Sequence, residues 1–115
     1  MKLSEWEIRL LLAVQSDRDE FAGMKLEWHP GGDRQESAKL TRRVTDARTG
    51  IVRIDLTRWL GRAPTASDRT QGCRAIRRLI ERGLLIGHGY ERTKLVELTA
   101  DGEAVARAIP KDGAA

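Results

Sequence analysis

The chain is poor in the residues that support disulfides, metal sites and membrane spans. Its 115 residues include one cysteine, Cys73, and two histidines, His29 and His88. A single cysteine excludes an intramolecular disulfide, and no Cys/His spacing typical of zinc is present. No run of about 18 apolar residues occurs, and Glu5 and Glu7 interrupt the first apolar stretch, which argues against a secretory signal. We therefore expect a cytoplasmic protein that uses no membrane, metal or cofactor.

Residue patterns that indicate catalysis are also missing. The sequence has no nucleophile spaced with a base, no paired carboxylates in a defined element and no glycine loop that would hold a phosphate. We interpret the acidic cluster Asp17, Asp19 and Glu20 as a solvated helix end. The sequence thus predicts a protein that is not an enzyme, and no small-molecule ligand is evident from it.

Positive charge, in contrast, is concentrated in one part of the chain. The formal net charge is +4, yet residues 58–94 hold nine Lys/Arg and three Asp/Glu, a net of +6. Residues 1–57 balance at zero and residues 95–115 carry −2. A contiguous basic excess is typical of a surface that meets phosphate, although a solvated arginine-rich helix would give the same count.

The length predicts a single domain over residues 1–109, with residues 110–115 as a flexible tail. Ser4 and Glu7 form a capping-box pattern, which predicts a helix from Glu5 to about Ser16. Residues 17–50 give weaker signals and are interpreted as an insertion or an extended connection.

Two local structures fit within residues 17–50. Ser37 is a suitable cap for a short helix that ends at Gly50, with Leu40, Val44 and Ala47 at helical spacing. Met24 to Trp28 would instead suit a short strand.

The second half of the chain gives clearer signals for helices, strands and turns. Pro64 separates two helical patterns, and Thr65, Ser67 and Asp68 are all competent N-caps for the second one. The expected elements are a strand near Ile51–Ile54, a helix from Asp55 or Leu56 to Gly61, a turn at Arg62–Ser67, a helix at Asp68–Arg82, a β-hairpin of Leu84–Ile86 with Thr93–Leu98, and a helix at Ala100–Ile109. We expect Ala104, Val105 and Ala108 to form the inward stripe of the last helix.

Two motifs in this half carry a family resemblance. The run from Arg74 to Leu85, "RAIRRLIERGLL", resembles the exit of the recognition helix in MarR-type bacterial regulators. The run from Leu98 to Glu103, "LTADGE", resembles the Leu-Thr-x-x-Gly exit of their hairpin. The resemblance covers about half of the chain, residues 54–108, and implies an α+β, mainly helical, winged helix-turn-helix fold, with a three-helix core and a small antiparallel sheet that forms a wing.

The resemblance also implies sites on the helix at 68–82 and on the wing at 87–93. In such proteins the exposed front of the recognition helix enters the major groove of DNA, and the wing lies on the backbone or in the minor groove. By position, the base-reading residues would be Arg69, Thr70, Gln71 and Arg74. Residues suited to the DNA backbone are Thr65, Ser67, Arg77 and Arg78, and the wing residues are His88, Tyr90, Arg92 and Lys94.

Other residues have an ordinary structural interpretation. Cys73 falls beside apolar positions and is expected to be a small buried core residue. Trp6 and Trp59 are expected to pack in the core, whereas Trp28 remains open to an interaction role. His29 and His88 are interpreted as surface residues without metal.

Taken together, these features predict sequence-specific binding of double-stranded DNA by a prokaryotic transcriptional regulator. Two alternatives remain open, because the same fold serves different tasks. One is a winged-helix module for protein contacts in a larger assembly, and the other is a phage or plasmid replication or maintenance protein. MarR-type proteins dimerise through long terminal helices that this chain lacks, so the sequence leaves both monomer and homodimer open.

Overall fold

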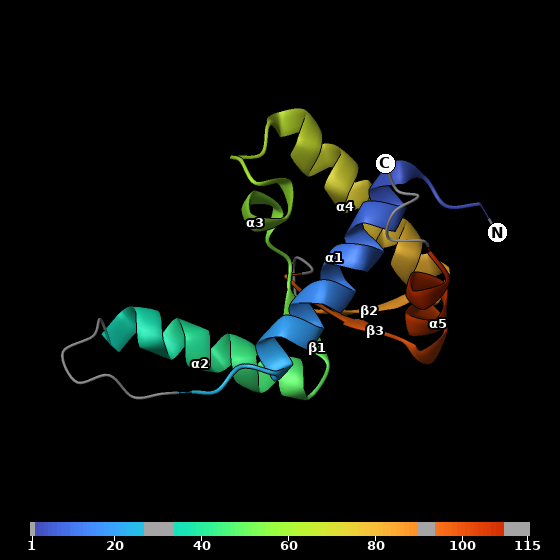
Figure 1. Cartoon of the computed structure of the whole chain (residues 1–115). Helices are drawn as coiled ribbons and strands as arrows, with labels where there is room; N and C mark the ends of the chain where they lie inside the picture. The colour runs from blue at the N-terminus through green and yellow to red at the C-terminus, as the bar shows by residue number, and fades with distance from the viewer. Residues whose placement is uncertain (1, 27–33, 90–93, 110–115) are drawn as a thin grey trace.

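The computed structural model describes residues 2–26, 34–89 and 94–109. Within this part, five helices and a small antiparallel sheet of three strands give an α+β, mainly helical architecture (Figure 1), as expected. The elements are α1 (Glu5–Ala22), α2 (Arg34–Arg48), β1 (Ile51–Arg53), α3 (Leu56–Leu60), α4 (Ala66–Glu81), β2 (Leu85–His88), β3 (Leu95–Leu98) and α5 (Ala100–Ala108).

The sheet has the strand order β1-β3-β2, so the last strand lies in the middle. Val96 of β3 pairs with Val52 on one side and with Gly87 on the other. Val96 is fully buried and Val52 is nearly so, which places one face of the sheet against the core. The expected hairpin is confirmed in its two strands, while Tyr90 and Arg92, which the sequence assigns to the wing, lie outside the described residues.

The core lies between α1, α4 and the sheet. Leu10 and Leu11 of α1 meet Leu79 of α4, and all three side chains are almost inaccessible to solvent. Trp6 and Trp59 are partly buried against the same cluster, which confirms their expected packing role. Full burial of each leucine side chain contributes about 1.5–3 kcal/mol, so these contacts hold α4 firmly on α1.

Helix α1 begins where the sequence predicts but runs six residues beyond Ser16. The interpretation of Asp17 as part of a solvated helix end is wrong, because Asp17 is only 5% exposed. Its carboxylate accepts hydrogen bonds from Arg58 Nε at 3.1 Å and from Trp59 Nε1 at 2.7 Å. Both donors belong to α3, so the last turns of α1 anchor that short helix.

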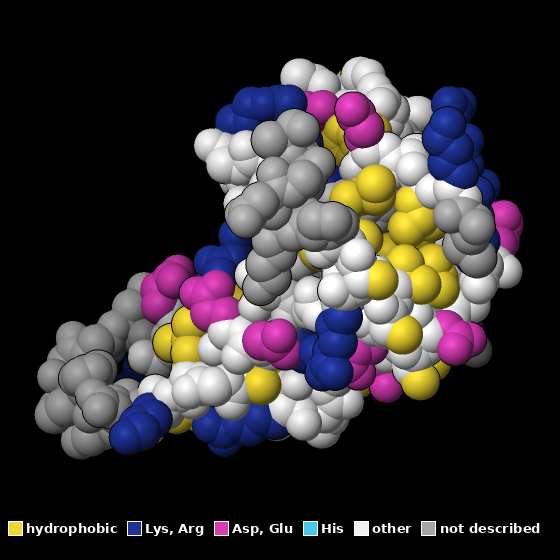
Figure 2. All heavy atoms as spheres, turned by 45° about the vertical axis from the view of Figure 1, so that its right-hand side comes forward, with side chains coloured by type: hydrophobic (Ala, Val, Ile, Leu, Met, Phe, Trp, Pro, Cys, Tyr) yellow, Lys and Arg dark blue, Asp and Glu magenta, His cyan; other side chains and the backbone are white. Residues whose placement is uncertain are grey.

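Residues 34–48 form α2, a longer helix than the one expected from Ser37. Val44 and Ala47 are buried with Phe21 in a second, small apolar cluster, whereas Leu40 is 43% exposed and does not pack as expected. The alternative strand is wrong for Met24–Leu26, which is irregular, and Trp28 lies outside the described residues. Figures 1 and 2 show α2 projecting from the main body at the lower left.

Helix α5 is capped by Thr99 as predicted, but its inward residues differ from those expected. Gly102 and Ala106 are buried and Val105 packs on the core, while Ala104 and Ala108 are exposed. A Cβ atom at Gly102 would collide with the carbonyl oxygen of Leu84, so this position requires glycine. Residue 102 therefore takes the inward position nearest the start of the helix.

Candidate nucleic-acid interface

The start of α4 is fixed by a reciprocal cap. The Thr65 hydroxyl accepts a hydrogen bond from the backbone N–H of Asp68 at 3.1 Å, and the Asp68 carboxylate accepts one from the N–H of Thr65 at 2.9 Å. Helix α4 therefore begins at Ala66, two residues before the expected start, and the cap is Thr65 rather than Ser67 or Asp68. The Thr65 hydroxyl is already committed to the helix.

Arg62 adds a charge to this cap. Its guanidinium donates to both oxygens of Asp68, at 2.6 and 3.4 Å. The bonds from Arg62, together with those from Thr65, hold the pKa of the Asp68 carboxyl well below its usual range. The carboxylate next to the exposed face of α4 is therefore ionised and paired with a cation.

The structure brings the expected contact residues of α4 onto one exposed surface. Its buried stripe consists of Gly72, Ala75, Ile76 and Leu79 together with Asp68 at the cap. The opposite side is exposed to solvent and is called the α4 face here; it comprises Arg69, Thr70, Gln71, Cys73, Arg74, Arg77 and Arg78. Five of these residues, Arg69, Thr70, Cys73, Arg74 and Arg77, line a shallow depression.

The four arginines of the α4 face differ from the other arginines of the basic stretch. Arg58 is paired with Asp17 and Glu20, Arg62 with Asp68, and Arg82 with Glu7. No acidic partner within hydrogen-bonding distance is found in the described part of the chain for Arg69, Arg74, Arg77 or Arg78. The described arginines of the basic stretch thus separate into three that are paired within the fold and four on the α4 face that are not.

The two polar side chains of the α4 face are engaged within the helix. Thr70 Oγ1 donates to the backbone oxygen of Ala66 at 3.0 Å, and Gln71 Nε2 donates to Ser67 Oγ at 2.9 Å. A glutamine that reads adenine uses both its amide nitrogen and its oxygen. Gln71 must therefore release or share its bond to Ser67 before it makes such a contact.

Cys73 is not buried as the sequence predicts. It is exposed and lies between Arg69 and Arg77, each one helical turn away. At a spacing of four residues, the three side chains share one side of the helix. The small neighbours Gly72 and Ala75, and not Cys73, take the positions against the core.

The residues expected in the wing have different environments. His88 lies in β2, and its Nε2 is 3.2 Å from Glu97 Oε1 on β3, so its ring is tied to the neighbouring strand. Lys94 is exposed and has no acidic partner among the residues described, and its backbone oxygen accepts a hydrogen bond from Ile54 at 2.9 Å. Tyr90 and Arg92 lie outside the described residues, so only Lys94 is placed as a free cation.

In the described ranges 2–26, 34–89 and 94–109, no group of three or more His, Cys, Asp or Glu is arranged to hold a metal ion. No helix in these ranges is both long enough and apolar enough to cross a membrane.

No protein-family model, curated protein or solved structure matches the chain.

Sequence reasoning could not separate free arginines from paired ones. Glu7 and Asp17, which neutralise Arg82 and Arg58, lie far away in the chain on α1. A signal did exist, because both acids fall among the apolar positions of α1, where an ionised side chain needs a partner. The bond between Ser67 and Gln71 could also have been anticipated, since residues four apart on a helix are neighbours.

Proposed function

We propose that the chain is a winged helix-turn-helix protein that binds double-stranded DNA in a sequence-specific manner and regulates transcription in a prokaryote. In this proposal α4 is the recognition helix and the β2–β3 hairpin is the wing. The α4 face enters the major groove, and the hairpin lies on the adjacent backbone or minor groove.

The order of the elements supports this fold. A short helix, α3, is joined by a tight turn to α4, which leads through Gly83 directly into the hairpin. Strand β1 precedes α3 and pairs with the last strand, so the three strands form one sheet beside the helices. This is the chain order of a winged helix-turn-helix, with α2 as an addition between the first helix and β1.

The observation that carries the function is the set of four unpaired arginines on the α4 face. Charged side chains that share a face without acidic partners repel one another, and an anionic partner removes this cost. DNA carries regularly spaced phosphates, and arginine also pairs bidentately with the guanine edge. The major groove, about 12 Å wide, accepts one α-helix.

The proposed roles follow from position along α4. Arg69, Thr70, Gln71 and Arg74 lie within the first nine residues of the helix and are assigned to base edges. Arg77 and Arg78 lie one turn further on and are assigned to phosphates, together with Ser67 and Lys94. Thr65 is assigned to the backbone through its place at the helix start, where N–H groups favour an anion.

The direct test is binding of a mixed-sequence duplex, followed by fluorescence anisotropy over a salt series. We compare the wild type with the variant Arg74→Gln/Arg77→Gln. The slope of log K against log salt is negative, and each phosphate contact that is lost reduces its magnitude by about 0.9. A lost base contact weakens binding without changing the slope. Because Arg77 is assigned to phosphate and Arg74 to a base edge, the variant is expected to bind more weakly and to have a salt slope that is smaller in magnitude by about 1.

A matched control separates the α4 face from overall charge. The variant Lys2→Gln/Lys25→Gln removes the same number of positive charges from exposed side chains that are not part of the α4 face. It is expected to keep nearly the wild-type affinity and slope. Equal losses in both variants would contradict a specific role for α4, and the absence of wild-type binding at low salt would overturn the DNA proposal.

A further inference from the structure

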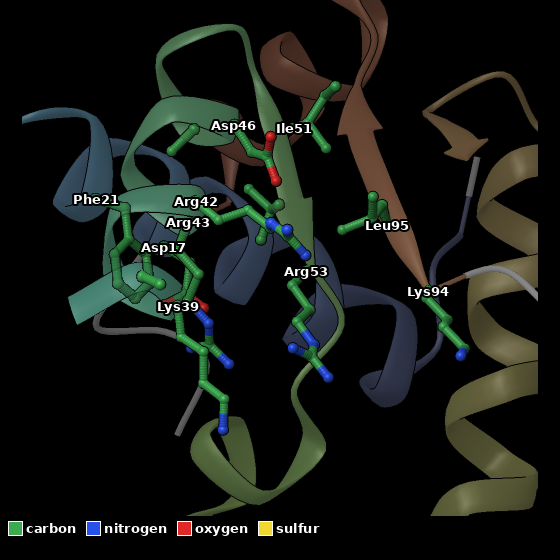
Figure 3. A pocket seen from close by; sticks show the side chains of 13 residues that line it. Asp17, Phe21, Lys39, Arg42, Arg43, Asp46, Ile51, Arg53, Lys94 and Leu95 are labelled. Carbon is green, nitrogen blue, oxygen red and sulfur yellow. The ribbon is translucent and has the colours of Figure 1, made fainter. Parts of the chain in front are cut away.

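A second cluster of unpaired cations lies away from the α4 face, around a pocket of about 410 Å³. The pocket is formed where α2 crosses the edge of the sheet beside the last turn of α1 (Figure 3). Four elements, α1, α2, β1 and β3, thus supply its walls. Of these, α2 belongs to the stretch that the winged-helix pattern does not explain.

The inner wall of this pocket is apolar. Phe21, Ala47 and Val52 are buried at its base, and Ile51 and Leu95 contribute partly exposed side chains. Pockets of about 300–1,000 Å³ with mainly apolar walls and a few polar groups are typical of small-molecule sites. The apolar floor of the pocket therefore suits the hydrocarbon part of a ligand.

The rim carries the charge. Lys39 and Arg42 of α2, Arg53 of β1 and Lys94 before β3 all line the pocket and are exposed. Within the described ranges, none of these four makes an ion pair. Figure 3 shows Lys39 and Arg53 extending from separate elements toward the same side of the opening.

The other ionisable groups of the pocket leave this charge uncompensated. Arg43 is paired with Asp55 at 2.9 Å, and Asp17 is occupied by α3. Asp46 is the remaining acid in the lining, and it lies beside Ile51, on the side away from Lys39 (Figure 3). The rim thus holds four free cations and one acid.

We propose that this pocket binds a small amphipathic anion, an organic acid whose apolar body rests on Val52, Ala47 and Leu95 while its acidic group meets Arg42, Arg53 and Lys39. An apolar pocket floor alone would accept a neutral molecule. Surface cations alone would accept any inorganic anion. The two features together select a ligand that has both parts. Lys94 is the one residue that both proposals use, but the ligand contacts proposed here are those of Arg42, Arg53 and Lys39, and they are tested without DNA.

The probe is 1-anilinonaphthalene-8-sulfonate, an aromatic sulfonate that fluoresces when it leaves water. Titration into the folded wild-type protein is expected to give a saturable signal with one site per chain. Octanoate is expected to displace the probe, whereas octanol and inorganic phosphate at the same concentration are not. Displacement by octanol as effective as by octanoate, or by phosphate alone, would overturn the amphipathic character of the site.

Two variants locate the probe. Arg42→Gln/Arg53→Gln is expected to raise its Kd about tenfold, which corresponds to about 1.4 kcal/mol. Ala38→Trp fills the pocket from an exposed position on α2 and is expected to abolish saturable binding. Circular dichroism and thermal unfolding verify that both variants are folded.

The control is again Lys2→Gln/Lys25→Gln, which removes two exposed positive charges that do not line the pocket. Its Kd for the probe is expected to stay within about twofold of the wild-type value. Wild-type affinity in both pocket variants, or no saturable signal from the wild type, would overturn the proposal. Because DNA is absent from this experiment, its result is separate from the test of the α4 face.

Discussion

Arg82, the residue that follows α4, donates a hydrogen bond of 2.6 Å to the carboxylate of Glu7 in the first turn of α1. Glu7 is 2% exposed and its other oxygen completes the cap of α1 by accepting from Ser4. A buried carboxylate needs such a partner, because transfer of an ion out of water costs several kcal/mol. The pair therefore joins the end of α4 to the start of the chain.

We expect Arg82→Met to destabilise the protein because it leaves Glu7 buried without a cation. The expected loss in the free energy of unfolding is about 2 kcal/mol, below the roughly 3–5 kcal/mol of a fully buried pair, since Arg82 itself is partly exposed. Urea unfolding measures the difference. The double variant Glu7→Gln/Arg82→Met should regain part of the loss, because no charge is then left buried.

Arg78→Met is the matched comparison for this prediction. Arg78 lies one turn earlier on the exposed side of α4 and has no acidic partner in the described residues. Its replacement is expected to change the free energy of unfolding by no more than about 0.5 kcal/mol. Equal losses for the two arginines would show that the contact with Glu7 contributes nothing.

Gly102→Ala is expected to destabilise the protein, which reverses the usual effect of alanine in a helix. At an open helical position alanine is better than glycine by about 1 kcal/mol. Here the added methyl group would meet the Leu84 carbonyl, and overpacking of this kind costs about 1–3 kcal/mol. Thermal unfolding of Gly102→Ala decides the sign, and a stabilised variant would contradict the close approach.

Gly102 illustrates which parts of the fold the sequence alone could predict. Thr99 donates to the Gly83 carbonyl at 2.6 Å and accepts from Gly102 N–H at 2.9 Å, so "LTADGE" ties α5 to the turn that follows α4. The threonine and glycine of this motif are thus explained by packing and hydrogen bonding between α5 and the turn, without reference to a function. The sequence accordingly predicted the α+β class and most elements after residue 50.

The features that the sequence did not predict depend on contacts between residues that are distant in the chain. Asp17 was misjudged because its partners, Arg58 and Trp59, lie on another helix. Its place among the apolar positions of α1 indicates that it needs a partner but not which residue provides one. Cys73 was misjudged because Gly72 and Ala75 are also small, and only the packing on α1 and α3 decides which of them face inward. The pocket beside α2 is lined by four elements, which no single sequence window contains.

Stability should fall in acid partly through Asp68. Its pKa is lowered in the folded protein, chiefly by the hydrogen bond from Arg62, so ionised Asp68 stabilises the fold at neutral pH. This contribution is fully present above the unfolded-state pKa, about 3.9 for aspartate, and is lost as the pH falls through the lower folded-state value. Unfolding should therefore become easier below about pH 4.

Asp68→Asn and Arg62→Met are both expected to flatten this acid dependence. The first removes the titrating group, and the second removes the main cause of its lowered pKa. Both variants keep a second carboxylate, Asp55, whose protonation also lowers stability in acid. Burial raises the pKa of Asp55, but the hydrogen bonds from Arg43 and from the Arg58 N–H, together with nearby positive charge, outweigh burial and lower it. Urea unfolding between pH 2 and pH 6 gives the comparison, and an unchanged profile in Asp68→Asn would refute the assignment.

The different DNA contacts proposed for the arginines of α4 predict two kinds of DNA-binding defect. Arg74→Ala removes an assigned base contact and should reduce discrimination at one base pair by about 1–3 kcal/mol. Arg78→Ala removes an assigned phosphate contact and should weaken binding to all sequences alike, with a salt slope lower by about 1. Selection of sites from a random pool, followed by a salt series for each variant, separates the two effects.

Cys73 offers a direct report on whether DNA covers the α4 face. Because its side chain is exposed beside Arg69 and Arg77, the thiol of the folded protein should react with a maleimide reagent, and Cys73→Ser removes the signal completely. A bound duplex would cover the depression and slow the reaction in proportion to the fraction of protein bound. Raising the salt concentration should release the duplex and restore the rate, since phosphate contacts weaken with salt. Full reactivity in a saturated complex would mean that DNA is held by another surface, whereas no reaction in the free protein would mean that the thiol is buried as the sequence alone suggests.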